Sequence, residues 1–179
     1  MKKDSSLHMI LTLVIIAVIV GGLMSYVNGL TAPIIEENNI KALNKSLSEI
    51  IPADNYEAVN EGDTTIYLAY NGEEKAGVLV SCVEQGYGGA LRVLTGVDIN
   101  GKIVGIDILE SSETAGLGAN ASNPSFKNQY IGKKGTIGVS KAYSNETDIK
   151  AITGATITSK AVTAAANNAL NIAQKYQEG

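Results

Sequence analysis

The sequence predicts an α+β fold: an antiparallel sheet with flanking helices, preceded by a single N-terminal transmembrane helix. Three observations predict this class, namely a long uncharged apolar run near the N-terminus, two Asn-Gly pairs between apolar stretches, and a strongly helical C-terminal segment. With 179 residues the chain is long enough for one such domain and leaves little room for a second core.

The composition excludes several kinds of site. The chain contains one cysteine, Cys82, and one histidine, His8, which is too few for a disulfide framework, a cysteine-ligated cluster, a histidine metal site or a catalytic triad. We therefore expect no metal site and no catalytic residue. The net charge of −4 argues against nucleic acid as a partner, because a protein that binds the phosphate backbone needs a basic surface.

The apolar residues are concentrated near the N-terminus. They make up 45% of the chain, and no charged residue occurs between Asp4 and Glu36. Within this gap the 19 residues Met9–Val27 would span about 29 Å as a helix, which is close to the thickness of the hydrocarbon core of a membrane. We expect a transmembrane helix over residues 9–30 and a cytoplasmic stub over residues 1–8.

Charges at the two ends of this run predict its orientation. Lys2 and Lys3 precede the run. Glu36 and Glu37 follow it, so the positive-inside rule places the N-terminus in the cytoplasm and the domain outside. The alternative is a cleavable signal peptide with small residues near Val27–Gly29 as the cleavage point, although the apolar run is longer than the usual ~7–15 residues of such a peptide. Both alternatives place the domain outside the cytoplasm.

Small residues recur every four positions along the same run, at Ala17, Gly21, Ser25 and Gly29. On a helix they form one stripe, which lets the backbone of a second membrane helix approach closely. Packing against a partner helix is one interpretation. Chance is the other, because glycine is common in membrane helices.

Residues 31–58 are predicted to form a connecting helix and a linker. Apolar residues three to five positions apart over Ile34–Ile51 predict a helix that Pro52 ends. The polar segment Asp54–Thr64 is predicted to be a loop, and the extracytoplasmic domain is expected to occupy residues 59–179.

Two Asn-Gly pairs, Asn71-Gly72 and Asn100-Gly101, lie between apolar stretches. Such pairs favour tight hairpins because both positions tolerate positive φ, so we expect several antiparallel strands over Ile66–Leu109. Cys82 lies in one of these apolar stretches and is predicted to be a small buried side chain rather than a reactive thiol.

One short helical turn and one long helix are predicted in the last part of the chain. A short turn is expected around Phe126 and Tyr130, with Phe126 in the core. The segment Ser159–Lys175 predicts a long helix with Thr158 or Ser159 as its N-cap. The apolar stripe of this helix consists of Val162, Ala165, Ala169, Ile172 and Ala173.

Two segments contain the candidate chemistry. Thr153–Ser159 holds four hydroxyls and a glycine at the predicted start of the last helix, where exposed N–H groups favour an anion such as phosphate; ordinary capping is the alternative. Glu113–Gly118 contains two glycines and a carboxylate, which indicates either a turn that approaches a flat ligand closely or a plain surface loop. Gly86–Gly89 is a further glycine-rich turn.

Together the two segments resemble the extracytoplasmic FMN-binding domain family. The resemblance rests on Glu-Thr-x-Gly-Leu-Gly at residues 113–118, followed by Thr-Gly-Ala-Thr at residues 153–156 before an alanine-rich helix. With a single N-terminal span and this length, the chain is most similar to the G subunits of Rnf ion-translocating oxidoreductases. The C subunits of sodium-translocating NADH:quinone oxidoreductases are similar but typically longer.

The resemblance implies a covalent FMN that is joined to Thr156 by a phosphoester bond. Further implied cofactor-binding residues come from the threonine motif and the preceding loop: Thr153, Gly154, Ala155, Glu113, Thr114, Gly116, Leu117 and Gly118. Two positions depart from the family pattern, which usually has proline at Ala115 and an acidic residue at Lys150. Asp148, two residues before Lys150, could replace the usual acidic residue only if the loop were adjusted.

The resemblance also implies a function. It implies an electron-carrying subunit of a ferredoxin:NAD oxidoreductase that is coupled to Na⁺ or H⁺ transport in the bacterial cell membrane. The implied partners are the other membrane subunits of the complex and, for maturation, a flavin transferase. Two alternatives stay open: a free-standing membrane-tethered covalent flavoprotein, and a pilin-like structural ectodomain.

Overall fold

The computed structural model describes residues 3–141 and 145–177 of the chain. Its contacts divide the chain into two units, Met1–Lys41 and Ala42–Gly179, which are described separately. Lys2, on which part of the predicted orientation depends, lies outside the described residues.

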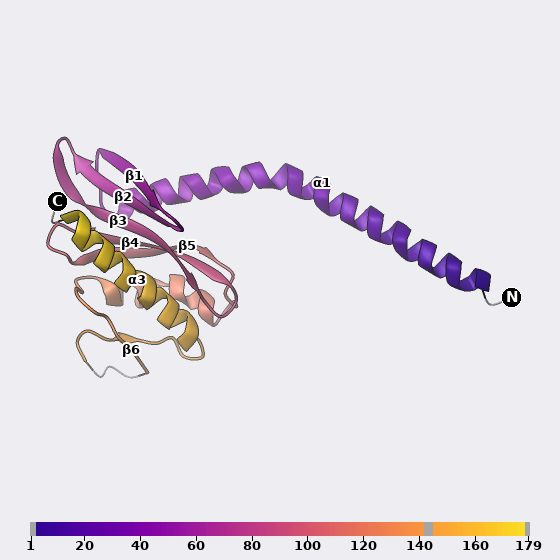
Figure 1. Ribbon diagram of the computed structural model, residues 1–179. Coiled ribbons are helices and arrows are strands. Elements are labelled where there is room, and N and C mark those ends of the chain that lie inside the picture. Colours follow the sequence, from indigo (N-terminus) through magenta and orange to yellow (C-terminus); the bar gives the residue numbers. More distant parts are fainter. Residues whose placement is uncertain (1–2, 142–144, 178–179) are drawn as a thin grey trace. The chain divides into compact units, whose positions relative to one another are not determined.

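A single helix, α1 (Lys3–Ile50), contains both the predicted transmembrane helix and the predicted connecting helix (Figure 1). Pro33 lies inside this helix, and it does not end the helix although proline lacks an N–H donor. From Leu7 to Ile50 the helix includes an 18-residue window with a mean hydropathy of 2.6 and no buried side chain. The helix is therefore long and apolar enough to cross a membrane.

Five strands form one antiparallel sheet in which neighbours in the chain are neighbours in the sheet. They are β1 (Asn55–Glu61), β2 (Thr64–Asn71), β3 (Glu74–Gln85), β4 (Ala90–Asp98) and β5 (Ile103–Ser111). Both predicted hairpins are confirmed, because Gly72 and Gly101 lie in the turns after β2 and β4 with φ of +62° and +72°. Positive φ at these positions is the conformation that Asn-Gly pairs favour.

Strand β1 replaces the loop that the sequence predicts over Asp54–Thr64, so that prediction is wrong. All but one of its residues are exposed, and it pairs with β2 along its whole length. Its sequence does not alternate regularly between apolar and polar residues, so the usual signal for a strand is missing. The backbone hydrogen bonds to β2 form the strand instead, and Gly62, with φ of +62°, lies in the turn between the two strands.

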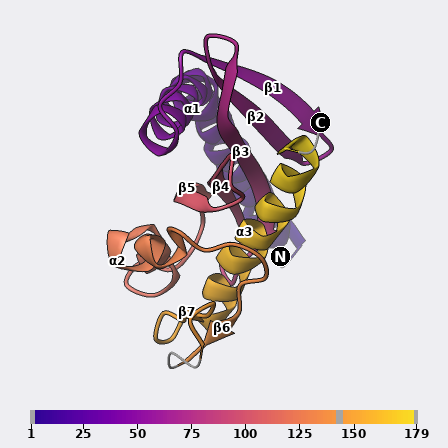
Figure 2. The ribbon, with the colours of Figure 1, turned by 90° about the vertical axis from the view of Figure 1, so that its left-hand side faces the viewer.

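Helix α3 (Thr156–Gln177) packs against β3 and β4 on one face of the sheet (Figure 2). The predicted apolar stripe is confirmed. Ile172 packs against the core, and the other four residues of the stripe are buried in it: Val162, Ala165, Ala169 and Ala173. Cys82 is buried in this core, and burial raises the pKa of its thiol to about 11. The prediction of a small buried side chain is therefore confirmed.

The end of α1 packs on the sheet within the second unit. Leu47 and Ile51 are buried there against apolar residues of β2, β3 and β4. Glycines on neighbouring strands leave room for this last turn: a Cβ atom at Gly96 would lie 3.3 Å from Ile51 Cγ1, and one at Gly105 would lie 3.0 Å from Ile50 Cγ2. The missing side chains thus let the helix end lie close to the strands.

Where the structure describes the chain between β5 and α3, its elements are short. These are η1 (Gly118–Ser122), α2 (Pro124–Lys127), η2 (Asn128–Tyr130) and the parallel pair β6 (Val139–Ser140) and β7 (Ile149–Lys150). Phe126 and Tyr130 are buried, with ring centroids 5.6 Å apart, so the predicted helical turn and the core position of Phe126 are confirmed.

Candidate functional site

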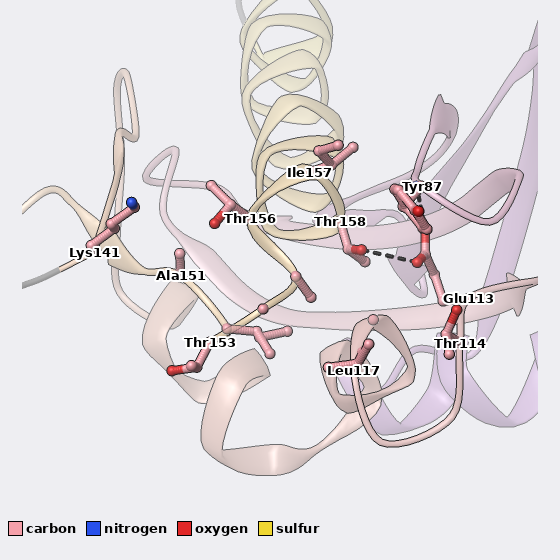
Figure 3. Close-up of a pocket in the computed structure, with 14 residues that line it drawn as sticks. Tyr87, Glu113, Thr114, Leu117, Lys141, Ala151, Thr153, Thr156, Ile157 and Thr158 are labelled. Atoms are coloured by element: carbon pink, nitrogen blue, oxygen red, sulfur yellow. Dashed lines mark hydrogen bonds between the residues drawn. The ribbon is translucent and has the colours of Figure 1, made fainter.

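A pocket of about 650 Å³ opens beside the first turn of α3 (Figure 3). This volume lies within the range of small-molecule sites in proteins. The lining comes from the β3–β4 turn, the loop after β5, the residue after β6, the segment that leads into α3 and the first turn of α3. The lining residues are Tyr87, Glu113, Thr114, Leu117, Gly118, Lys141, Ala151, Ile152, Thr153, Gly154, Ala155, Thr156, Ile157 and Thr158.

The fold brings eight of the nine predicted cofactor residues to this one pocket. The exception is Gly116, which is exposed and has φ of +77°, so it shapes the loop without lining the pocket. Ala151, Ile152, Ile157 and Thr158 also line the pocket and belong to the hydroxyl-rich segment before and at the start of the last helix, although they were not predicted to bind the cofactor. Sequence reasoning missed the two remaining lining residues, Tyr87 and Lys141. Tyr87 had a weak signal, an aromatic residue inside a glycine-rich turn, whereas nothing in the sequence pointed to Lys141. Ala115 and Lys150, the two departures from the family pattern, do not line the pocket.

Helix α3 begins at Thr156, three residues before the predicted start, so neither Thr158 nor Ser159 is the N-cap. The physical reason is a set of bonds that the Ser159 side chain makes from inside the helix. Its hydroxyl accepts a hydrogen bond from the N–H of Ile152 at 2.9 Å and donates one to the carbonyl of Ala155 at 2.9 Å. Ser159 thereby fastens the preceding segment to the helix rather than capping its end.

The segment before α3 is a tight turn. The N–H of Ala155 donates to the carbonyl of Ile152 at 3.0 Å, and Gly154 occupies the third position with φ of +79°. Positive φ at that position is typical of a type II turn, which favours glycine. The first helical hydrogen bond then runs from the N–H of Ser159 to the carbonyl of Ala155 at 3.0 Å.

Thr156 is the first residue of α3 and lies at the end of the pocket that favours an anion. The N–H groups of the first turn of a helix have no helical acceptors, and the helix dipole adds partial positive charge there. Within the part of the chain that the structure describes, the Thr156 hydroxyl makes no hydrogen bond. Figure 3 shows this hydroxyl directed to the side on which Lys141 lies. The pocket therefore holds one free hydroxyl at a helix start, and the ammonium group of Lys141 lies on the side to which this hydroxyl is directed.

Glu113 lies on the opposite side of the pocket (Figure 3). Its Oε1 atom accepts hydrogen bonds from the N–H groups of Tyr87 at 2.7 Å and Gly88 at 3.3 Å. Its Oε2 atom accepts one from the buried Thr158 hydroxyl at 3.0 Å. This carboxylate therefore contacts two other segments that line the same pocket.

Apolar side chains line the rest of the pocket. Leu117 and Ile157 are 45% and 53% exposed, and Tyr87 is 73% exposed. Three large apolar side chains around one opening offer a surface for a flat apolar ligand, because burying them would remove apolar area from water. The pocket therefore combines an anion-binding end with an apolar side.

Comparison with known proteins places the chain in a family. An FMN-binding domain matches residues 86–171, and an RnfG N-terminal region matches residues 1–50. The G subunit of the proton-translocating ferredoxin:NAD⁺ oxidoreductase complex of Clostridium ljungdahlii is 35% identical over 185 residues, which covers 100% of both chains. The chain belongs to the family of Rnf G subunits. The G subunit of the Na⁺-translocating complex of Acetobacterium woodii is also 35% identical, over 94% of this chain and 91% of its own.

Solved structures of the related C subunits have the same fold as this Rnf protein. The C subunit of the Na⁺-translocating NADH-quinone reductase of Parabacteroides distasonis superposes with a TM-score of 0.58 at 25% identity, covering 76% of this chain and 82% of its own. NqrC of Shewanella oneidensis, at 16% identity and a TM-score of 0.53, shares the fold over 73% of this chain and 71% of its own. The predicted α+β class is confirmed.

The family match decides between the alternatives that the sequence left open for the function. The chain is a G-type subunit of a membrane-associated ion-translocating oxidoreductase and contains an FMN-binding domain. Every residue that lines the pocket lies within the matched range 86–171. A purely structural ectodomain does not fit an FMN-binding domain. The match over residues 1–50 and the full-length relatives favour the G type over the C type.

Proposed function

We propose that this member of the Rnf G family carries electrons through an FMN that is bound covalently to Thr156 by a phosphoester bond. The observation that supports the proposal most directly is the free hydroxyl of Thr156. It is the first residue of α3 and lines the pocket inside the FMN-binding domain. A phosphate joined to this hydroxyl would lie where helix N–H groups favour an anion.

The described residues fit both parts of FMN. The phosphate end matches the start of α3 and the ammonium group of Lys141, which share one side of the pocket (Figure 3). The flat ring matches the apolar side, which Tyr87, Leu117 and Ile157 form. We propose that Thr153, Gly154, Ala155, Thr114 and Gly118 shape the contacts around the cofactor.

A covalent bond has a clear physical purpose here. The helix dipole contributes only about 0.3–1 kcal/mol to holding an anion, which is too little to retain FMN on an exposed domain. One bond to Thr156 prevents its loss. When bound, FMN supplies the redox chemistry, and the chain positions it and sets the local electrostatics. This division of roles agrees with a chain whose one histidine is His8.

The proposed setting follows from the relatives and the charge pattern. Two relatives, each 35% identical to this chain, are named as G subunits of a proton-translocating and of an Na⁺-translocating ferredoxin:NAD⁺ oxidoreductase complex. We propose electron transfer between ferredoxin and NAD⁺, coupled to H⁺ or Na⁺, with the other membrane subunits as partners and a flavin transferase for maturation. The N-terminus is proposed to lie in the cytoplasm and the domain outside the inner membrane.

Flavin fluorescence on a denaturing gel tests this proposal, since only a covalent flavin stays with its band. The chain made together with a flavin transferase should fluoresce, and Thr156→Ala should not. Thr153→Ala is the matched control, because its hydroxyl lines the same pocket three residues away. Thr156→Ala should cost no more than about 1 kcal/mol of stability, the scale of losing one polar group at a helix start. A fluorescent Thr156→Ala band would contradict the proposal.

A further inference from the structure

Glu113 joins three segments that are distant in the sequence. Its carboxylate accepts hydrogen bonds from the turn between β3 and β4, at Tyr87 and Gly88, and from the first turn of α3, at Thr158. Glu113 itself lies in the loop after β5. A carboxylate has about four acceptor positions, and the protein already uses three of them. Its hydrogen-bonding capacity is therefore directed mainly to the chain.

Glycines make the room in which this carboxylate lies. A Cβ atom at Gly86 or at Gly118 would collide with a carboxylate oxygen of Glu113. At Gly88 a Cβ atom would collide with the carbonyl oxygen of Ser112 and lie 3.2 Å from the Glu113 Cα. None of these three glycines has positive φ. This part of the pocket therefore requires glycine at these positions because it has no side chain, and not because it can adopt an unusual backbone conformation.

The segments that Glu113 joins are the ones that place the pocket's key groups. The β3–β4 turn presents Tyr87, and the first turn of α3 presents Thr156 two residues before Thr158. Thr158 is fully buried and Glu113 is half-buried, so their bond is partly shielded from water. A hydrogen bond to a charged group in such a place is stronger than one at the surface. Loss of the carboxylate would free both segments at once.

We propose that Glu113 is a positioning residue, which holds the Tyr87 turn and the start of α3 in the geometry that FMN requires without binding FMN itself. The identity of the ligand rests on the proposed function above. The hydrogen bonds belong to the chain alone, so they can be tested without FMN.

Hydrogen exchange of the full-length, detergent-solubilised protein, made without a flavin transferase, provides the first test. In Glu113→Ala the amides of Tyr87 and Gly88 should exchange about tenfold faster, which is the scale of losing a hydrogen bond to a charged group. Glu110→Ala is the matched control, because Glu110 lies three residues before Glu113 and is exposed. Its carboxylate pairs with Arg92 and not with the Tyr87 turn. Unchanged exchange at Tyr87 and Gly88 in Glu113→Ala would overturn the proposal. Protected amides in the β4 core would establish that the variant is folded.

Covalent FMN content provides the second test and uses rescue by a conservative variant. Glu113→Gln keeps an acceptor for the two amides and gains a donor toward Thr158. The variant should therefore retain FMN, and the amides of Tyr87 and Gly88 should exchange as slowly as in the unaltered chain. Glu113→Ala should lose most of its FMN. If Glu113→Gln loses FMN as fully while its amides stay protected, the carboxylate contacts FMN directly and the proposal is wrong. If the unaltered chain takes up no FMN, the proposed function fails, and the exchange result still decides the role of Glu113.

Discussion

Tyr87 is held by its backbone while its ring stays exposed. Its N–H donates to Glu113, and 73% of the residue is exposed at the pocket. An aromatic ring stacked on a flavin would contribute about 0.5–1.5 kcal/mol beyond its buried area. We predict that Tyr87→Leu keeps FMN on Thr156 but lowers the ratio of docked to undocked flavin ring about fivefold, the effect of roughly 1 kcal/mol. Visible circular dichroism of the flavin measures this ratio, and Tyr87→Phe is the control. An unchanged signal in Tyr87→Leu would contradict the role of the ring.

Site residues could be predicted from the sequence where they share a short motif. Thr156 and Glu113 each lie in a segment whose hydroxyls or glycines are unusual by themselves. The weak signal at Tyr87 was not enough to assign it to the site, and Lys141 had no signal, because they reach the pocket only through the pairing of β3 with β4 and the position of β6. The sequence also does not show that Glu113 contacts Thr158, since 45 residues separate the two in the chain.

A side-chain link fastens the end of α1 to the domain. Ser46 of α1 donates a hydrogen bond to Asp107 of β5 at 2.7 Å, and Lys127 of α2 donates to the same carboxylate at 2.8 Å. Burial raises the pKa of Asp107, but the hydrogen bonds from Lys127 and Ser46 and the charge of Lys127 outweigh it. The pKa therefore lies below its ordinary value of 3.8. The ionised carboxylate thus stabilises the folded domain.

We predict that Asp107→Asn lowers the free energy of unfolding by about 1–2 kcal/mol near neutral pH, the scale of hydrogen bonds to a charged group. The pKa of Asp107 is lower in the folded state than in the unfolded state. The stabilisation by its carboxylate is therefore fully present at a pH above the unfolded-state pKa, and it is lost as the pH falls through the folded-state pKa. The difference between the variant and the unaltered chain, measured by urea unfolding, should therefore shrink below about pH 4. Asp63→Asn, at an exposed position, is the control. A difference that does not change with pH would contradict this account of Asp107.

Helices and strands could be predicted where the signal is local. The two Asn-Gly hairpins and the stripe of α3 depend on nearby residues, so the sequence was sufficient for them. Strand β1 could not be predicted, because pairing with β2 rather than an apolar pattern forms it. The start of α3 could not be predicted either, because it depends on which groups the Ser159 hydroxyl contacts in the folded chain.

The orientation of the whole chain in the membrane is a prediction that rests on the charges at the ends of the apolar run. With positive charge inside, a protease added to intact cells, or to spheroplasts where an outer membrane covers the cell, should reach the domain after residue 30. Digestion followed by blotting of an N-terminal tag and of the domain measures this, with a cytoplasmic protein as the control for intact cells. Cleavage of the domain only after lysis would reverse the orientation and would remove the need for an FMN that cannot dissociate.

The most direct measurement of the central claim is the mass of one peptide from the chain made with a flavin transferase. Trypsin cuts after Lys150 and Lys160, which releases residues 151–160 with every hydroxyl at the start of α3. The account predicts that this peptide is heavier by the mass of FMN less one water, and that fragmentation places the added mass on Thr156. An unmodified peptide, or the added mass on Thr153 or Thr158, would contradict the account.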